Sequence, residues 1–394
     1  MRVDLLTREY PPFTYGGAGE HVAGLARHLR PLVDLRVHCH GTAREEDGVR
    51  AHRAPAPLAE HDPATEAMAI SLAMAEAVRG SSVVHSHTWY ANFAGHLAKI
   101  RHSLPHVVTA HSLEPLRPWK GDQLADGYRV SSWLERSAVA GADRVIAVSD
   151  AMAADVSRVY PEVDEARISV VYNGIDLAEF AADDGTDELV GFGIGPDRPV
   201  VACVARITPQ KGLHHLLRAA RHFSPDAHLV VVAQHADSPR LRRSFANDVL
   251  AARAAGCHVT WIGDHFTRRA LKQLLTLAQV FVCPSVYEPM GIVILEAMAC
   301  GAPVVATATG GIREVVVDGG TGLLVPIAPA PGGLEPADPE IFAKEIAARV
   351  EDLLHDPATA DRMGRAGRLR VATEFSWAKS AAQVKSIYEA VTRD

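Results

Sequence analysis

The chain has 394 residues, of which 48% are hydrophobic and 22% charged, and 40 basic against 47 acidic side chains give a formal net charge of −7. This length exceeds one ordinary domain, so two domains of comparable size are expected. The basic residues form no run, which argues against nucleic acid or a membrane as a partner. Five scattered cysteines, without any long apolar segment, predict a cytoplasmic protein with reduced thiols.

The first half alternates short apolar runs with segments of helical periodicity. Strands are predicted at VDLLT, LRVHC, SVVHS, HVVTA, RVIAVS and ISVVYNG, and helices at segments such as GEHVAGLARHLR and SSWLERSAVAGA. Continuously apolar strands are typical of a parallel sheet covered on both faces. In such α/β sheets, ligands bind beyond the carboxyl ends of the strands, so polar and glycine-rich residues at those ends are the candidates for function.

The first such strand end is followed by tandem prolines and then by Gly16 and Gly17 at the predicted start of a helix. Backbone N–H groups there suit a phosphate, although a structural turn is an equally good interpretation. The spacing lacks the G-x-G-x-x-G pattern of a dinucleotide site, which counts against an NAD enzyme.

Histidines mark the next strand ends. His85 and His87 alternate within one strand, as do His38 and His40 in another, and either pair is a metal site or a pair of ordinary buried or exposed histidines. No carboxylate or cysteine in the sequence pattern completes a ligand set, so no metal is predicted. His111, at the end of a strand, is a better candidate for a substrate contact.

The second half repeats the alternation, with strands predicted at PVVACVARI, HLVVVAQ, HVTWIG, VFVCPS, PVVATA and GLLVP. Two doubly wound α/β domains follow, one over residues 1–177 and one over 178–375. The join is an acidic, aperiodic stretch that begins AADDGTDELVG, and a final helix at 376–394 is expected to pack back on the first domain.

Charged residues flank two strand ends of this second domain. Arg206 and Lys211 surround the first strand-to-helix turn and suit a diphosphate leaving group, although a solvated pair is the alternative. Glu288 follows the strand VFVCPS, and Gly291 begins the next helix. Glu296 falls about one and a half turns into that helix, where a carboxylate can accept hydrogen bonds from ribose hydroxyls.

These motifs together resemble those of a known family. EPMGIVILEAMACG, preceded by RITPQKG and followed by GGIREVVVDGGTG, is similar to the retaining nucleotide-sugar glycosyltransferases of family 4. The resemblance implies the GT-B architecture, in which two Rossmann-like domains face one another across a cleft. LTREYPP, HSHTWY and TAHSLEPLRPWK look closer still to the actinobacterial glycogen synthase subgroup. Members of that subgroup use ADP-glucose, and several glucosylate glucose 1-phosphate to α-maltose 1-phosphate.

The resemblance also implies roles for individual residues. The residues that it assigns to the donor nucleotide sugar are Gly16, Gly17, Arg206, Lys211, Glu288, Met290, Gly291, Ile292, Val293 and Glu296. His111 is implied to lie beside the anomeric centre. The larger bacterial glycogen synthases carry a lysine where this chain has Thr14, which favours family 4 over the polymerising family 5 enzymes.

The implied reaction needs no metal or other cofactor, because the chain has no D-x-D triplet and the two cations and helix N-termini take its place. Retention without a carboxylate nucleophile favours front-face attack, in which the leaving phosphate accepts the acceptor's proton. The acceptor is predicted to be glucose 1-phosphate, held by Arg117, Lys120 and Arg129. The alternative is a growing α-glucan chain on Trp119 and Tyr128.

Other functions remain open at this stage. A sugar-nucleotide 2-epimerase, a phosphorylase and a non-catalytic sugar-nucleotide sensor share or borrow the same architecture, and a family 4 mannosyltransferase is the nearest rival among transferases. A phosphorylase needs pyridoxal phosphate and a much longer chain. The donor base is not specified by a side-chain motif, and a homodimer is possible.

Overall fold

The computed structural model describes residues 1–59, 62–124 and 126–393. The chain forms two compact units, one made of Met1–Gly174 and Trp377–Asp394 and the other of Ile175–Ser376. We refer to them as unit 1 and unit 2. The sequence pattern places the divisions after residues 177 and 375, and the contacts place them after Gly174 and Ser376.

Unit 1 is built on a parallel sheet in the order β3-β2-β1-β4-β5-β6-β7. The strand order reverses between β1 and β4, where Leu5 pairs with Val37 on one side and His85 on the other. The strands are β1 (Arg2–Leu6), β2 (Asp34–His40), β3 (Val49–His52), β4 (Val83–His87), β5 (His106–Ala110), β6 (Arg144–Ala147) and β7 (Ile168–Val170).

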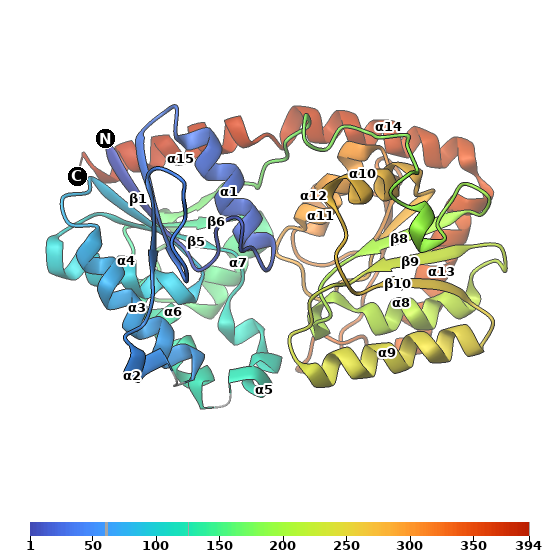
Figure 1. Ribbon diagram of the computed structural model, residues 1–394, viewed down its shortest axis with the longest axis horizontal. Helices are drawn as coiled ribbons and strands as arrows, with labels where there is room; N and C mark the ends of the chain where they lie inside the picture. Colours follow the sequence, from blue (N-terminus) through green and yellow to red (C-terminus); the bar gives the residue numbers. More distant parts are fainter. Residues whose placement is uncertain (60–61, 125, 394) are drawn as a thin grey trace. The chain divides into compact units, whose positions relative to one another are not determined.

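Helices cover both faces of this sheet (Figure 1). One group contains α1 and α15, whose Leu25 and Tyr388 share a core cluster with the sheet. The other contains α3, α4 and α6, which contact one another. The helices of unit 1 are α1 (Gly17–Leu29), α2 (Ala56–Ala59), α3 (Pro63–Ala77), α4 (Trp89–His102), α5 (Gly121–Leu124), α6 (Gly127–Gly141), α7 (Asp150–Val159) and α15 (Trp377–Val391).

The last helix, α15, lies in unit 1 although the chain reaches it through unit 2. Its apolar side chains Trp377, Ala381, Val384, Tyr388 and Val391 are buried in the cluster that includes α1. Gly24 of α1 permits this packing, because a Cβ at that position would lie 2.4 Å from the Trp377 ring.

Unit 2 repeats the same winding with the order β10-β9-β8-β11-β12-β13, again all parallel. Here the order reverses between β8 and β11. The strands are β8 (Val200–Val204), β9 (His228–Val232), β10 (His258–Ile262), β11 (Val280–Cys283), β12 (Val304–Thr307) and β13 (Gly322–Val325).

Its helices again divide between the two faces, with α8, α9 and α13 on one and α10, α11 and α14 on the other (Figure 1). The helices are α8 (Leu213–Ala219), α9 (Pro239–Ala254), α10 (Arg268–Leu277), α11 (Ile292–Cys300), α12 (Ile312–Val315), α13 (Pro339–His355) and α14 (Pro357–Glu374). No helix among the described residues is both long and apolar enough to span a membrane.

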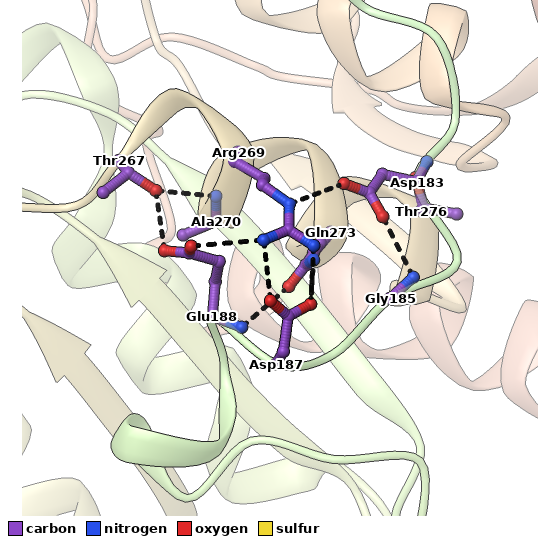
Figure 2. Close-up of polar contacts among 9 residues, drawn as sticks. All are labelled: Asp183, Gly185, Asp187, Glu188, Thr267, Arg269, Ala270, Gln273 and Thr276. Atoms are coloured by element: carbon purple, nitrogen blue, oxygen red, sulfur yellow. Dashed lines mark hydrogen bonds and ion pairs between the residues drawn. The ribbon is translucent and has the colours of Figure 1, made fainter.

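The acidic, aperiodic stretch that begins at residue 181 is held against α10, mainly by Arg269. Arg269 holds Asp187 through two bonds of 2.7 and 2.9 Å, and it also lies 3.4 Å from Asp183 (Figure 2). Gln273 donates to the same Asp187 at 2.8 Å and accepts from the backbone of Glu188 at 3.1 Å. An irregular segment can therefore be well ordered when its backbone and carboxylates are satisfied from a neighbouring helix.

Candidate active site

The loops after β8, β11 and β12 form the candidate site in unit 2. These three strands are neighbours in the sheet, and β8 and β11 flank the point where the strand order reverses. Loops at the carboxyl ends of such strands are where α/β sheets bind ligands. The residues predicted from the sequence to bind the donor, other than those near Gly16, all lie in or next to these loops.

Two glycines allow the loops to approach each other closely. A Cβ on Gly212, which has φ +61°, would lie 2.1 Å from the carbonyl oxygen of Pro284. A Cβ on Gly310 would lie 2.1 Å from the carbonyl oxygen of Glu288, and Gly311 donates its N–H to that same oxygen at 3.1 Å. The Gly-Gly turn after β12 thus supports the segment that carries Glu288.

Lys211 and Glu288 form the central ion pair of this site. Lys211 Nζ lies 2.5 Å from Glu288 Oε2, and the same oxygen accepts a hydrogen bond from Ser285 Oγ at 3.1 Å. The two side chains are 16% and 7% exposed, so solvent screens their interaction less than at the surface. The alternative of a solvated cation pair at the first turn is therefore wrong for Lys211.

Arg206 and Glu296 are also held by specific partners. Arg206 Nη1 lies 3.3 Å from Asp237 Oδ1, whose side chain is 1% exposed. Glu296 Oε1 lies 3.8 Å from Arg268 Nη1, and Arg268 bonds Glu179 at 3.2 Å. Glu296 is the fifth residue of α11 and is buried, as predicted for a carboxylate on this helix.

The helix α11 begins where the sequence predicts. Gly291 is its N-cap residue with φ +89°, and Ile292 and Val293 form its first turn. A positive φ is easily adopted only by glycine, and no side chain caps this helix end. The first N–H groups of a helix lack intrahelical partners and favour an anion. Met290, just before the cap, is buried.

In unit 1, the glycine loop after β1 also starts a helix, with Gly16 as N-cap and Gly17 as the first residue of α1. The structure adds a feature that the sequence pattern does not reveal. Glu9 Oε2 accepts hydrogen bonds from the N–H groups of Tyr15 at 2.7 Å and Gly16 at 2.9 Å. A carboxylate of the chain itself therefore occupies the N–H group of Gly16, one of the two glycines expected to meet a phosphate.

His111 follows β5 directly and lies within a group of histidines. Its Nε2 is 3.1 Å from His87 Nδ1, and its ring centroid is 4.5 Å from that of His21. Burial lowers the pKa of His87 and His111 well below the usual histidine value and that of His21 to about 4. The three imidazoles are therefore neutral at physiological pH.

The loop after His111 is organised by a buried glutamate, Glu114. Its carboxylate accepts a hydrogen bond from Ser131 Oγ at 2.9 Å and lies 3.4 Å from Arg117 Nη1. Its carbonyl oxygen accepts from Tyr128 Oη at 2.6 Å. Arg117 and Tyr128, both predicted for the acceptor, are thus engaged in ordering the loop.

A second buried carboxyl group, that of Glu135 on α6, lies next to Glu114. It accepts hydrogen bonds from the Glu114 N–H at 2.8 Å and from Tyr160 Oη at 2.5 Å. Burial, together with the nearby Glu114 carboxylate, raises the pKa of Glu135 to about 8.

The remaining predicted acceptor residues differ in exposure. Lys120, at the end of a short 3₁₀ turn (Pro118–Lys120), is buried, and Trp119 beside it is half-buried. Arg129 on α6 is exposed.

The sequence analysis missed several residues that complete these groups. Asp237, in the loop after β9, holds Arg206, and Ser285, in the same loop after β11 as Glu288, holds that carboxylate. Glu9 and His21 are the others. A signal for His21 was available, because it lies one turn into the helix that starts at the glycine loop.

Comparisons with known proteins agree with this organisation. Residues 15–179 match the family model described as Glycosyltransferase Family 4, and residues 188–370 match Glycosyl transferases group 1. The α-maltose-1-phosphate synthase of Mycolicibacterium smegmatis is 47% identical over 395 residues, covering 100% of both chains. The chain belongs to glycosyltransferase family 4.

Proteins of lower sequence identity also match this chain over most of its length. A glycogen synthase of Mycobacterium tuberculosis is 30% identical, over 100% of this chain and 95% of its own. The structure of a sucrose-phosphate synthase from Thermosynechococcus elongatus superposes with a TM-score of 0.79 at 24% identity, covering 99% of this chain and 98% of that one. The chain therefore has the GT-B fold, with two parallel-sheet Rossmann-like units, and is a glycosyltransferase.

Proposed function

We propose that this glycosyltransferase transfers glucose from ADP-glucose to glucose 1-phosphate, with retention, and so forms α-maltose 1-phosphate. The observation that carries the proposal is the 47% identity to an α-maltose-1-phosphate synthase over the full length of both chains. The match spans all of both chains, so it includes the loops at the strand ends as well as the sheets. The product would serve α-glucan synthesis.

For the donor, Arg206 and Lys211 neutralise the diphosphate as it leaves. Lys211 has Glu288 as its partner at 2.5 Å, and the diphosphate offers the same ammonium group a second anion. The N–H groups at the start of α11, from Ile292 and Val293, add positive potential to the same loop region. Glu296 binds the ribose hydroxyls, while Glu288 with the backbone near Met290 and Gly291 binds the transferred glucose.

The glycine loop has a narrower role than the sequence suggests. Because Glu9 already accepts from the Gly16 N–H at 2.9 Å, a phosphate there must displace that carboxylate or use other N–H groups, such as that of Gly17. In this exchange the donor phosphate replaces the Glu9 carboxylate, so the Gly16 N–H has a hydrogen-bond acceptor both before and after the donor binds.

The chemistry at the anomeric centre uses neutral groups. His111 contacts the transferred glucose as a neutral hydrogen-bonding ring, because a buried imidazolium would repel the positive charge that develops on the sugar. The acceptor hydroxyl attacks from the face that the phosphate leaves, and a leaving phosphate oxygen accepts its proton. No metal ion is required, since Arg206 and Lys211 supply the positive charge.

For the acceptor, the phosphate of glucose 1-phosphate is bound by cations of the 117–129 segment. Arg129 is the exposed member of the set, and Arg117 is fixed by Glu114 and Ser112. Lys120 is buried, so it contributes by ordering the loop or by a small movement toward the ligand. Trp119 and Tyr128 would instead support a glucan chain.

A product assay tests the proposal. The enzyme is incubated with ADP-glucose or UDP-glucose, and with glucose 1-phosphate or glycogen, and products are identified by mass spectrometry. A disaccharide monophosphate formed with ADP-glucose is the expected result. Label incorporated only into glycogen would identify a chain-elongating synthase, and no turnover with any pair would overturn the substrate assignment.

A further inference from the structure

Three histidines of unit 1 converge on one point. His21 comes from α1, His87 ends β4, and His111 directly follows β5. Each offers one ring nitrogen such that the three atoms lie within 4.8 Å of one another. The His21 ring centroid is 4.5 Å from that of His111 and 5.3 Å from that of His87. Three elements distant in sequence therefore bring three nitrogen ligands together.

The hydrogen bonds around His21 fix which nitrogen is available. His21 Nδ1 lies 2.7 Å from Asn173 Oδ1, and since an amide oxygen only accepts, Nδ1 carries the proton. The lone pair of neutral His21 is therefore on Nε2, which is buried and has no hydrogen-bond partner among the described residues. A metal-bound histidine usually donates the N–H of its other ring nitrogen to an oxygen acceptor, so His21 is oriented as such a ligand.

The second histidine has the same kind of vacant nitrogen. His87 bonds His111 through Nδ1, and its Nε2 is buried without a partner in the described part of the chain. The neighbouring His85 is different, because its two nitrogens bond Tyr388 Oη and Thr109 Oγ1, each at 2.7 Å. His85 is therefore a structural histidine, whereas His21 and His87 each keep one buried ring nitrogen without a partner among the described residues.

We propose that His21, His87 and His111 bind one Zn²⁺ ion, and that this ion inhibits the enzyme. Three neutral imidazoles suit Zn²⁺, and a set without carboxylate ligands disfavours Mg²⁺. Zinc–nitrogen bonds of about 2.0–2.1 Å in a tetrahedron place nitrogens about 3.3 Å apart, so any of the three nitrogens that lie nearer the 4.8 Å limit must move closer when the ion binds. His111 is half-buried, which leaves a side for a fourth ligand.

Inhibition itself rests on the proposed function, because it follows from the engagement of His111 by the ion. Binding of the ion does not rest on that function.

Unit 2 contains a second possible metal-binding group, and the experiment must distinguish it from the three histidines of unit 1. His214 and His215 lie 3.4 and 2.8 Å from the same Glu335 oxygen, which makes another possible cation site. His214 and Glu335 are 41% and 50% exposed. A Glu335→Gln variant therefore serves as the matched control.

The test uses the full-length protein without a histidine tag. Zn²⁺ binding is measured by competition with a chromophoric chelator, and Co²⁺ is substituted to read ligand geometry from its visible spectrum. The wild type is expected to bind one Zn²⁺ that His21→Gln weakens by at least about 10-fold, while Glu335→Gln leaves it unchanged. Asn173→Ala, which removes the partner of His21 Nδ1, should weaken it by about 10- to 100-fold.

Turnover supplies an independent readout. Zn²⁺ should inhibit the wild type reversibly, with recovery on adding a chelator, and His21→Gln should need at least about 10-fold more Zn²⁺ for the same inhibition. Circular dichroism checks that the variants fold, and His87→Gln replaces His21→Gln if the latter does not. Zinc affinity equal in the wild type and the folded histidine variant, or lost in Glu335→Gln, overturns the proposal. If turnover is absent, the binding measurement still decides the site.

Discussion

The carboxyl edges of the two sheets share one topology but carry different chemistry. Both sheets reverse their strand order at one point, between β1 and β4 in unit 1 and between β8 and β11 in unit 2. In unit 2 that edge carries the ion pair of Lys211 and Glu288, whereas in unit 1 it carries the neutral ring of His111. The winding therefore fixes where a site forms, and the side chains at the strand ends decide what it binds.

The difference fits the two parts of a glycosyl transfer. In the proposed reaction, the leaving diphosphate requires fixed positive charge, which Arg206 and Lys211 would supply. The sugar centre would develop positive charge of its own, and His111, as a neutral ring, would avoid repulsion. Variants that remove the charge or disturb the loops in unit 2 should therefore differ in their effects from variants that remove the neutral ring in unit 1.

Removing the charge of Lys211 should have the largest effect. Lys211→Ala deletes one fixed cation and leaves Glu288 buried without its partner. Loss of one electrostatic donor costs about 3–4 kcal/mol, or about 10²–10³-fold in kcat. Steady-state kinetics with ADP-glucose measure this. Lys344→Ala, at an exposed position on α13, is the control. A less than 10-fold change would remove Lys211 from the charge-neutralising role.

The next effect tests the close approach of the unit 2 loops. Gly212→Ala places a Cβ 2.1 Å from the Pro284 oxygen at φ +61°, whereas at Gly193, with φ +69°, a Cβ meets no atom within 4 Å. Both substitutions pay the left-handed backbone penalty of about 1–2 kcal/mol, and Gly212→Ala adds overpacking of about 1–3 kcal/mol. Denaturant unfolding should show the larger loss for Gly212→Ala. Equal losses would mean that the loops adjust freely.

Replacing the neutral ring in unit 1 should have a smaller effect on rate. His111→Asn removes a hydrogen-bonding ring without changing charge, which corresponds to about 1–3 kcal/mol, or about 10- to 100-fold in kcat. His222→Asn, at an exposed position in unit 2, is the comparison. Activity that survives His111→Asn unchanged would contradict a sugar contact at this edge.

The buried carboxyl group of Glu135 lies outside the proposed catalytic groups, so its effect should be a pH dependence of stability and not a change in rate. Its pKa is raised to about 8 in the folded protein, so folding favours the protonated form. Its contribution is complete below the unfolded pKa of about 4.3 and is lost as pH rises through about 8, by at most about 1.4 kcal/mol per pH unit. Between pH 5 and 8, the wild type should lose more stability than Glu135→Gln. Parallel pH profiles would show that Glu135 is ionised throughout.

The sequence was sufficient for the parts that depend on local pattern. Apolar β-branched runs predicted the strands of both sheets, and Gly291 marked the start of α11 because glycine tolerates a positive φ there. The short β3 (Val49–His52) was missed, since VRAH has little apolar character. β3 pairs with β2 at the edge of the sheet, a position in the strand order that the sequence pattern does not indicate.

Side-chain partners were beyond the sequence pattern because they join distant segments. His21 and Asn173 are 152 residues apart, and Lys211 and Glu288 are 77 apart. Arg117 and Lys120 were predicted from charge and position in the sequence, yet Arg117 is tied to Glu114 and Lys120 is buried. A charged residue in a loop indicates a ligand contact only when the fold leaves its charge accessible.

The most direct test of the account follows the reaction of wild-type enzyme with ADP-glucose and glucose 1-phosphate by ¹H and ³¹P NMR. We expect ADP and an α-1,4-linked disaccharide 1-phosphate to appear in equal amounts, with the donor's anomeric configuration retained. A β-linked product, or ADP released together with free glucose and no disaccharide phosphate, would contradict it.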